Sequence, residues 1–456
     1  MSKPKNAIRD EERPFLIHEL FFSTTDRAGV IQSGNEVFRR VAAFDTLEEM
    51  IGKPHNVIRH PDMPRAVFRL LWDYLEQGKV FGGYVKNLAT DGAYYWVFAL
   101  IVPIKNGYLS VRFKPSSPYF RVIREVYKEL LAIEAESGNK PGLRQAAMER
   151  AGERLGAILN EKGFADYDDF MQMAMATEMS SREKLIGAVE RVQPADRKSA
   201  WAESLSMCYE FEDKLELMFR RVETFLSLIA QLESSSSFIL NLAEQIHLLS
   251  LNSLISSHRL GEQGQGLAVV ANDLARISGD GTSVITTMAS HIQGLVSGLR
   301  QTAFNISGAK LQVGMAVTFL LELLGQTASD ETRSREENDV QVLVVSFARS
   351  ADEIESTLPS LMSPLMAAKS HLDMLLAAVK SLSRIHLIGR VEAANVEDAH
   401  EFLQLFEEVE YQLQAARTEL RGFSCAIDSL WKGLPELEGH NRALRETLVR
   451  KETVAA

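Results

Sequence analysis

The feature that most constrains this chain is a pair of helix-forming stretches joined by a glycine-rich segment, Gly261-Glu-Gln-Gly-Gln-Gly266. Before this segment, the apolar residues spaced by threes, fours or their sum are Leu232, Ile239, Leu242, Ile246 and Leu249. After it, the same spacing continues with Val270, Leu274, Ile277, Val284, Met288, Ile292, Leu295 and Leu299. Two such helices bury their apolar stripes only against each other or against another chain. The pattern therefore predicts an antiparallel helical hairpin whose tip lies near residues 261–266.

Length and charge limit what the whole chain can be. At 456 residues the chain is too long for one compact core, so we expect two or three units. The net charge of −11 argues against general affinity for nucleic acid or anionic lipid, since both need a concentrated basic face. Nucleic acid is therefore not an expected partner.

Cysteine use and apolar runs indicate the compartment. Cys208 and Cys425 are far apart and lack metal-ligand spacing, so neither a disulfide framework nor a zinc cluster is expected. The first twelve residues lack the apolar core of a signal peptide. No apolar run reaches the roughly 20 residues that a membrane-spanning helix needs. We therefore expect a soluble, cytoplasmic protein without a membrane span.

Residues 15–118 differ from the rest because they hold the clearest strand-like runs. The strand-like runs are 21–25, 84–88, 94–102 and 108–113, and the helical stretches among them are 35–42, 46–50 and 64–77. Short β-branched and aromatic runs separated by Asp-Gly and Asn-Gly turns indicate antiparallel hairpins. The predicted fold class is α+β: one antiparallel sheet with helices on one face and a pocket between them, followed by a mainly α-helical coiled-coil or bundle region.

The remainder of the chain reads as helical. The predicted parts are a helical connector at 119–180, the hairpin at 181–310 and a helical extension at 311–456. Pro359 and Pro364 interrupt the extension. Residues 383–394 faintly echo residues 244–255, either as a decayed second copy of the tip segment or by chance. We expect the extension to fold back on the hairpin as a compact bundle.

Several motifs between residues 21 and 97 carry a family resemblance. They are Phe21-Phe-Ser-Thr-Thr-Asp26, Gly52-Lys-Pro-His-Asn56, Arg59-His-Pro-Asp-Met-Pro64, Val85-Lys-Asn87 and Tyr95-Trp-Val97. Together they resemble the PAS sensor domain of bacterial aerotaxis receptors, over about a hundred residues and in the same order.

This resemblance implies a flavin, usually FAD, in the pocket. Carried over by position, the resemblance implies that the cofactor is supported by Arg59, His60 and Asp62. It implies that Trp72 stacks near the flavin ring and that Asn35 and Asn87 offer hydrogen bonds. The chemistry suits a flavin, which needs a dry slot, an aromatic wall and fixed amide partners. One departure is Phe81, where the family commonly has Trp, so the wall on that side of the pocket is altered although an aromatic residue is kept.

Other interpretations of these residues stay open. Trp72 has the spacing of a core residue, and Arg59 with Asp62 could form a surface ion pair and a helix cap. His60 could instead ligate haem, and the pocket could be empty or purely structural.

The hairpin tip carries a second resemblance, through Leu242-Ala-Glu-Gln245, Leu248-Leu-Ser-Leu-Asn252 and Gly261-Glu-Gln-Gly-Gln-Gly266. It is similar to the signalling tip of methyl-accepting chemotaxis proteins, whose hairpins dimerise into a four-helix bundle. The resemblance implies contact with the chemotaxis histidine kinase and its coupling protein through Asn252, Arg259, Glu262 and Val269, and a homodimer. Alternatively, Val269 belongs to the core and the polar residues form a solvated face.

Departures from this family pattern weaken the expected coupling. Ser256 replaces an acidic residue, and Gln265 and Leu267 replace Arg and Phe. Because each glycine costs about 1 kcal/mol in a helix, Gly279 and Gly281 predict a flexible or broken second arm. No clear pair of methylation-type glutamates lies at the expected distance from the tip.

No catalytic motif emerges, so the chain is not expected to be an enzyme. The expected function is a soluble redox or oxygen sensor that passes the state of a PAS-bound flavin to a chemoreceptor-like output. The alternative is a scaffold or interaction protein whose degenerate chemoreceptor domain serves a partner outside chemotaxis.

Overall fold

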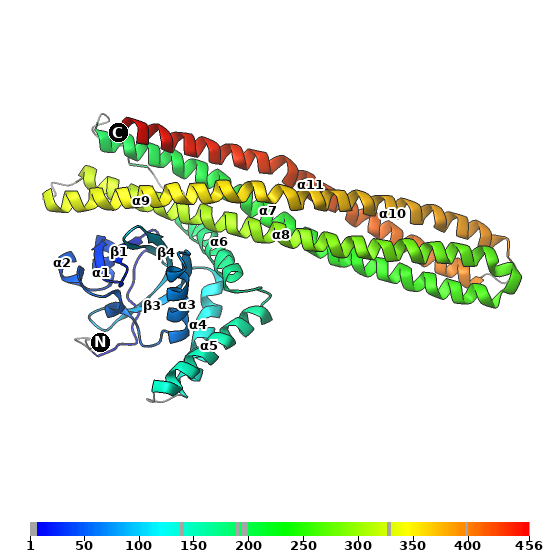
Figure 1. Ribbon diagram of the computed structural model, residues 1–456, viewed down its shortest axis with the longest axis horizontal. Coiled ribbons are helices and arrows are strands. Elements are labelled where there is room, and N and C mark those ends of the chain that lie inside the picture. Colours follow the sequence, from blue (N-terminus) through cyan, green and yellow to red (C-terminus); the bar gives the residue numbers. More distant parts are fainter. Residues whose placement is uncertain are drawn as a thin grey trace. The chain divides into compact units, whose positions relative to one another are not determined.

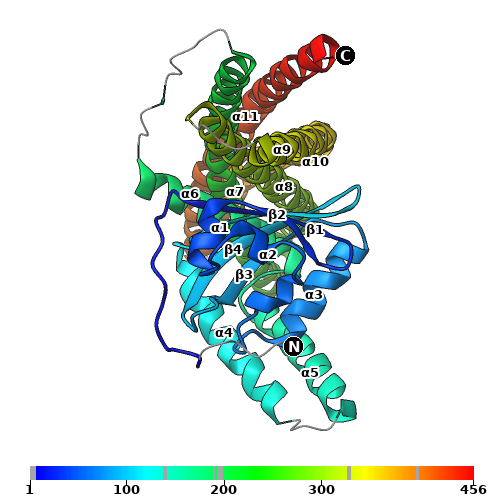
Figure 2. The same ribbon diagram turned by 90° about the vertical axis from the view of Figure 1, so that its left-hand side faces the viewer.

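The computed structural model describes residues 7–136, 141–187, 191–192, 199–325, 330–396 and 400–455. Figure 1 and Figure 2 show the helices and strands coloured along the sequence. The chain divides into two compact units. Unit 1 consists of Met1–Phe219, Ala303–Ile354 and Leu444–Ala456. Unit 2 consists of Arg220–Thr302 and Glu355–Ala443. Each unit is described by itself.

A five-stranded antiparallel sheet forms the centre of the N-terminal domain in unit 1. Its strands are β1 (Leu20–Asp26), β2 (Ile31–Gly34), β3 (Phe81–Leu88), β4 (Tyr94–Ile104) and β5 (Gly107–Phe113). The order across the sheet is β2-β1-β5-β4-β3, so the first and last strands of the domain meet in its middle. The predicted strands are confirmed, and β2 adds a short edge strand.

Three α-helices and one 3₁₀ helix lie between β2 and β3. They are α1 (Glu36–Val41), α2 (Leu47–Met50), η1 (His55–Ile58) and α3 (Arg65–Glu76). Side chains of Asn35 and Thr46 accept hydrogen bonds from the first turns of α1 and α2, as N-cap residues do. Gly78, with φ of +72°, ends α3 in the left-handed conformation that glycine tolerates. The predicted helices are confirmed, and so is the predicted fold class.

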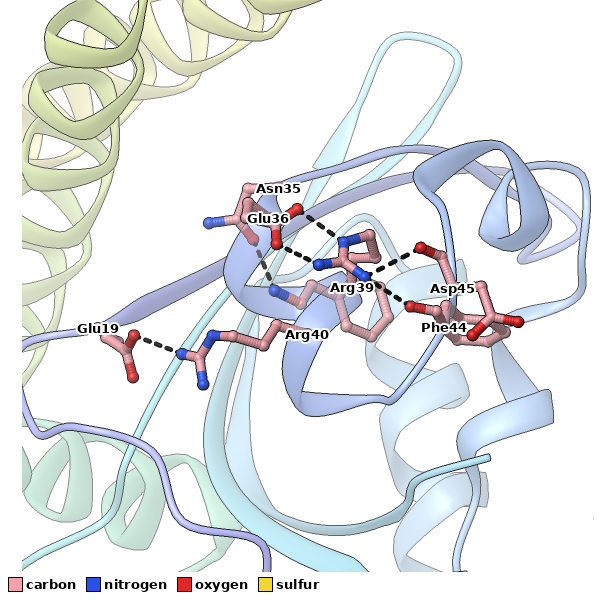
Figure 3. Close-up of polar contacts among 8 residues, drawn as sticks. Glu19, Asn35, Glu36, Arg39, Arg40, Phe44 and Asp45 are labelled. Carbon is pink, nitrogen blue, oxygen red and sulfur yellow. Dashed lines mark hydrogen bonds and ion pairs between the residues drawn. The ribbon is translucent and has the colours of Figure 1, made fainter. Parts of the chain in front are cut away.

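The end of α1 is held by two arginines, as Figure 3 shows. Arg39 pairs with Glu36 one turn earlier and donates to the carbonyl oxygens of Phe44 and Asp45, at 2.8 and 3.1 Å. Arg40 forms an ion pair with Glu19, which precedes β1. These contacts fix α1 and the following turn.

One face of the sheet carries a row of buried aromatic side chains. Tyr84, Phe98 and Phe113 lie opposite one another on β3, β4 and β5, with ring centroids 5.0 and 5.5 Å apart. On the neighbouring strand, Phe22 packs edge-to-face on Phe319, at 5.0 Å between centroids. Because Phe319 lies on a long helix of the second half of the chain, this face of the sheet contacts the helical region directly.

Three helices follow the sheet: α4 (Pro118–Ala135), α5 (Pro141–Glu161) and α6 (Tyr167–Ile186). Glu178 of α6 is fully buried, and its carboxylate accepts four hydrogen bonds. The donors are the Tyr84 hydroxyl at 2.8 Å, the Ser117 hydroxyl at 2.7 Å, and the backbone N–H groups of Ser116 and Ser117 at 2.6 and 2.9 Å. Glu178 therefore joins the sheet, the start of α4 and α6.

The remaining elements are α7 (Ala200–Arg259), η2 (Gly261–Gly264), α8 (Gln265–Gly325), α9 (Asp330–Thr357), η3 (Leu358–Leu361), α10 (Met362–Ala394) and α11 (His400–Ala455). The chain reverses at Gly261, whose φ is +59°.

The predicted break at Gly279 and Gly281 is wrong, because α8 continues through both residues. The buried stripe on either side of them, including Leu274 and Ile285, outweighs the glycine cost. The predicted interruption at Pro359 is confirmed as η3.

Two described helical segments are long and apolar enough to cross a membrane by length and composition alone. In Ala200–Arg259 the most apolar window has a mean hydropathy of 1.2, and in Gly261–Gly325 it is 1.3 with 67% of the window buried. Core helices of soluble proteins pass the same test. The expected absence of a membrane span therefore stays a prediction.

Candidate functional site

A cavity of about 220 Å³ lies between the sheet, η1 and α3. It is lined by Thr25, Ala28, Gly29, Pro54, His55, Asn56, Arg59, Phe68, Leu71, Trp72, Leu75, Val85, Asn87, Ala99, Ile101, Tyr108, Ser110 and Arg112. On β5 the alternate residues Tyr108, Ser110 and Arg112 face this cavity, because side chains of a strand alternate between its two faces. The wall is mainly apolar with a few polar groups, which is the usual composition of a small-molecule site.

The most unusual group in this wall is the buried guanidinium of Arg112. It donates to the Ser23 hydroxyl at 2.9 Å and lies 2.6 Å from Nε2 of His55. Since a guanidinium has no acceptor, Nε2 of His55 accepts this bond. No acidic side chain pairs with Arg112 in the part of the chain that the structure describes. Burial lowers the pKa of Arg112 to about 10, so it stays cationic at neutral pH.

Two buried polar atoms of this wall have no hydrogen-bond partner among the described residues. They are Nη1 of Arg112 and Oγ of Ser110. An unpaired buried donor costs about 1–3 kcal/mol, so such atoms are rare unless a ligand or water satisfies them. His55 adds a neutral imidazole, because burial and the nearby Arg112 hold its pKa well below the usual value. These groups present hydrogen-bond donors and positive charge to a ligand.

Three of the six predicted cofactor residues line the cavity: Arg59, Trp72 and Asn87. The Arg59 guanidinium lies over the ring of Phe68, 3.9 Å from its centroid, and donates to the carbonyl oxygen of Met63 at 3.2 Å. Trp72 packs edge-on against Tyr108 and also against the buried cluster of Leu71, Leu75 and Phe81. Trp72 therefore belongs both to the core and to the cavity wall. Phe81 belongs to that cluster and does not line the cavity.

Asn35, His60 and Asp62 are not among the cavity-lining residues. Asn35 accepts from the backbone N–H of Phe22 at 3.0 Å and of Phe38 at 3.2 Å, and donates to the carbonyl oxygen of Leu20 at 2.8 Å. Its side chain therefore ties α1 to β1, as the contacts in Figure 3 show in part.

His60 and Asp62 make contacts of their own beside the cavity. Nδ1 of His60 accepts from the backbone N–H of Asp62 at 3.0 Å, and burial together with Lys86 lowers the pKa of His60 to about 4. Asp62 pairs with Lys86 at 2.7 Å. The suggested Arg59–Asp62 ion pair and Asp62 helix cap are therefore wrong.

The first turn of α3 is capped from a distant part of the sequence. Both carboxylate oxygens of Glu134, on α4, accept hydrogen bonds at 2.9 Å from the backbone N–H groups of Arg65 and Ala66. A carboxylate at this position also complements the positive end of the helix dipole. The helix that carries Phe68 and Trp72 is thereby anchored to α4.

Sequence reasoning missed His55, Ser110 and Arg112. A sign of Ser110 and Arg112 was present, because an arginine two residues after a serine in an otherwise apolar strand lies on the same face as that serine. Tyr108, Ser110 and Arg112 share this period of two.

The four residues predicted to bind signalling partners all lie near the turn between α7 and α8. Asn252, Arg259 and Glu262 are exposed, and Val269 is 64% exposed. The alternative that Val269 is a core residue is therefore wrong, since its neighbour Val270 is buried instead. Whether these residues bind a partner stays a prediction.

Comparison with known proteins agrees with the geometry of the N-terminal domain. Residues 45–110 match the model of the PAS fold family. The N-terminal region contains a PAS domain. The aerotaxis receptor of Escherichia coli (strain K12) is 35% identical over 130 residues, which are 27% of this chain and 26% of the receptor.

Two further proteins show partial similarity. The methyl-accepting chemotaxis protein McpP of Pseudomonas putida is 47% identical over 58 residues, 12% of this chain and 11% of that protein. A crystal structure of the PAS domain of a Colwellia psychrerythraea protein matches 21% of this chain and 85% of that chain, with 22% identity and a TM-score of 0.19. The chain thus spans about a quarter of the aerotaxis receptor and about a tenth of McpP.

Proposed function

We propose that this chain is a cytoplasmic redox sensor in which the PAS domain binds a flavin and passes its state to a chemoreceptor-like helical output. The similarity to an aerotaxis receptor and a methyl-accepting chemotaxis protein supports a PAS-containing sensor of the chemotaxis type. The cavity supports the finer proposal. The observation that carries it is a pair of donors in a largely apolar cavity, Ser110 Oγ and Arg112 Nη1, which have no hydrogen-bond partner among the described residues.

The residues in the wall fit a flavin. A flavin ring system is flat, apolar on its faces and rich in hydrogen-bond acceptors along one edge. Trp72 and Phe68 would provide the aromatic wall, and Asn87, Ser110 and Arg112 would hold the polar edge. When bound, a flavin would supply reversible electron transfer.

The chain's own groups favour extra negative charge in the cavity. Arg112 is a buried cation that has no carboxylate partner among the described residues, so its charge is available to a ligand. His55 and Ser23 hold the guanidinium in place through hydrogen bonds. A gain of negative charge by a ligand would therefore be stabilised here, and would shift the hydrogen bonding of β5.

The haem alternative has less support from the geometry. His60 lies outside the cavity wall, and the Nδ1 atom accepts a backbone hydrogen bond. His55 lines the cavity, but Nε2 is engaged by Arg112. Neither imidazole is presented as a free ligand by these contacts.

Transmission can use the face of the sheet opposite the cavity. Successive residues of β5 and β4 alternate between the cavity and the aromatic row, so a shift of either strand moves both faces. The row reaches α8 through the Phe22–Phe319 contact and α6 through the Tyr84–Glu178 hydrogen bond. The output would thus be reached directly as well as through the expected exit helix, α4.

The tip of the hairpin is the proposed contact for a kinase-class partner. Asn252, Arg259, Glu262 and Val269 are solvent-facing, as a docking surface requires. The relatives support kinase-type partners and paired hairpins only in general terms. Of the departures noted in the sequence, Leu267 is fully buried, so it changes the core of the hairpin and leaves its surface unaltered.

The scaffold alternative rests on the loss of an acidic residue at Ser256 and on Gln265, which is exposed beside the turn. Copurification of the kinase and coupling protein with the full-length chain supports the sensor. Recovery of an unrelated regulator instead supports the scaffold.

The absorption spectrum of the purified protein tests the cofactor. We expect flavin absorption bands in the unmodified protein. These bands should be at least tenfold weaker in Arg112→Met. They should be retained in the control Arg69→Met, because Arg69 is exposed on α3. Absence of flavin bands after reconstitution with FAD, or a haem spectrum, overturns the cofactor proposal. The proposal of kinase control is tested with Val269→Glu, a substitution at an exposed residue. Unchanged kinase activity of this variant in a reconstituted assay overturns it.

A further inference from the structure

The chain contains a second helical hairpin that corresponds to the first in its pattern of burial. The first hairpin is α7, η2 and α8. The second consists of α9, η3 and α10, which ends at Ala394, and of α11, which begins at His400. Unit 2 contains the segments 220–259 and 265–302 of the first hairpin and 355–394 and 400–443 of the second.

The outgoing arms are related by a constant shift of 136 residues. From Val222 to Ser257, each buried residue of α7 has a buried counterpart 136 positions later in η3 or α10, with the single exception of Leu242. Examples are Val222 with Leu358 and Ile229 with Leu365. Both arms therefore present a buried stripe of the same three-four spacing to the bundle.

The returning arms are related by a shift of 135 residues. From Leu267 to Thr302, each buried residue of α8 except Val270 and Val296 has a buried counterpart 135 positions later in α11. The shift falls by one because the second connection is one residue shorter than the first. The stretch from Ala393 to Phe402 is one residue shorter than the stretch from Ser257 to Leu267. The relation therefore holds across both arms and the turn.

The faint echo between residues 244–255 and 383–394 is thus about one helical turn out of register. It pairs His247 with His386, a shift of 139 instead of 136. The correspondence lies in which positions are buried, and little of it is visible in residue identity.

One contact between the hairpins joins two counterpart residues directly, as a pseudo-twofold relation requires. In unit 1, the counterparts Phe211 and Phe347 touch each other, with ring centroids 5.0 Å apart. Counterparts meet in this way only where they lie on the axis that relates them.

In unit 2, the two hairpins interlock at several levels. The Ser235 hydroxyl on α7 donates to Glu419 on α11 at 2.8 Å. Gly389 on α10 leaves room for Val270 of the first hairpin, since a Cβ atom there would lie 2.7 Å from Cγ1 of Val270. The two hairpins therefore pack directly against each other at these positions.

We propose that the second hairpin is an internal counterpart of the first and that the two form the signalling bundle within one chain. The surface of the first hairpin that would receive a second copy of this chain is occupied by the second hairpin, within residues 330–396 and 400–455. The bundle is therefore completed without a homodimer, in place of the homodimer expected from the sequence.

Disulfide trapping at the axis tests this proposal in the full-length chain with both native cysteines replaced by serine. In Phe211→Cys/Phe347→Cys, oxidation is expected to give an internal cross-link and a single-chain product on non-reducing gels. Phe211→Cys alone is expected to give no covalent dimer. If the bundle pairs two copies of the first hairpin, position 211 faces itself and the single variant cross-links into a dimer, which overturns the proposal.

A second pair, which is only half-buried, guards against loss of packing at the axis. Ser235→Cys/Glu419→Cys, bridged by a short bismaleimide, is expected to give a cross-linked monomer. A covalent dimer from the double variant would mean that hairpins are exchanged between chains, and overturns the proposal. Light scattering of the unmodified protein is expected to give the mass of one chain, 50.9 kDa. A concentration-independent mass of two chains, with internal cross-links absent, contradicts it.

Discussion

The hydroxyl of Ser33 on β2 donates a hydrogen bond to Oδ2 of Asp339 on α9, across 2.5 Å. Asp339 is 1% exposed, and its other carboxylate oxygen has no partner among the described residues. Burial, reinforced by Glu336, raises its pKa from 3.8 to about 7, against the opposing effects of Ser33 and Arg335. The PAS domain and the helical region of unit 1 therefore meet at a carboxyl group that keeps its proton into the neutral range.

Stability should fall as pH rises through this contact. Below about pH 4 the carboxyl is protonated in both the folded and the unfolded chain, and its stabilising effect is fully present. Between about pH 4 and 7 only the folded chain keeps the proton, so unfolding is favoured by up to about 1.4 kcal/mol per pH unit. Asp339→Asn should flatten this dependence and raise the melting temperature at pH 8, measured by calorimetry. Asp280→Asn, at an exposed site, is the control, and equal pH slopes in all three proteins contradict the prediction.

Removal of Glu178 should weaken the junction between sheet and connector. Glu178→Ala leaves four buried donors without an acceptor, so we expect a loss of at least about 3 kcal/mol in the free energy of unfolding. Tyr84→Phe removes one of these bonds and should cost about 1 kcal/mol. Urea denaturation followed by tryptophan fluorescence measures both. Similar losses in the two variants would mean that the backbone donors find other partners.

Loss of the distant cap on α3 should affect both stability and the cavity. Glu134→Ala removes the acceptor for two N–H groups and should cost about 1–2 kcal/mol. Because α3 supplies Phe68 and Trp72 to the cavity wall, flavin affinity should fall as well. Glu129→Ala on the same helix, an exposed partner of Arg154, should change stability by less than about 1 kcal/mol. An unchanged flavin titration in Glu134→Ala would separate the cap from the site.

Two glycines of the helical region should respond to alanine in opposite directions. At Gly389 a methyl group would overlap the ring of Phe406 and crowd Val270, so Gly389→Ala should destabilise the protein by about 1–3 kcal/mol. At Gly279 the space is open, so Gly279→Ala should stabilise α8 by up to about 1 kcal/mol. Thermal unfolding followed by circular dichroism compares the two. A stabilising Gly389→Ala would show that the two hairpins do not approach closely there.

Much of the PAS domain was predictable because its elements carry local information. Asn35 and Thr46 mark the starts of α1 and α2 by their capping chemistry, and Asp91-Gly92 and Asn106-Gly107 mark the turns between the last three strands. The short strand β2 was less visible because four residues give too short a run for an alternation pattern.

The candidate site was predictable only where a motif supplied it. Arg59, Trp72 and Asn87 line the cavity, but Asn35 and His60 satisfy hydrogen bonds of the backbone instead. Which polar side chain turns inward depends on which backbone groups need a partner, and the sequence does not reveal that need.

The second hairpin was hidden for a different reason. Ser253 corresponds to Gly389 and Ser257 to Ala393, so the counterparts share small size and burial without sharing identity. Burial depends on packing, which residue identity alone does not reveal. The break predicted at Gly279 and Gly281 was wrong for a related reason. The low helix propensity of two glycines is outweighed by the packing of a continuous buried stripe, so α8 continues through them.

Joining all four helical arms in one chain changes how the bundle depends on abundance. Association of two hairpins tethered by a short connection is unimolecular, with an effective local concentration in the millimolar range for short linkers. Such a bundle stays assembled in a cell that holds only a few copies of the protein. For the same reason, tethering disfavours the exchange of hairpins between separate copies of the chain.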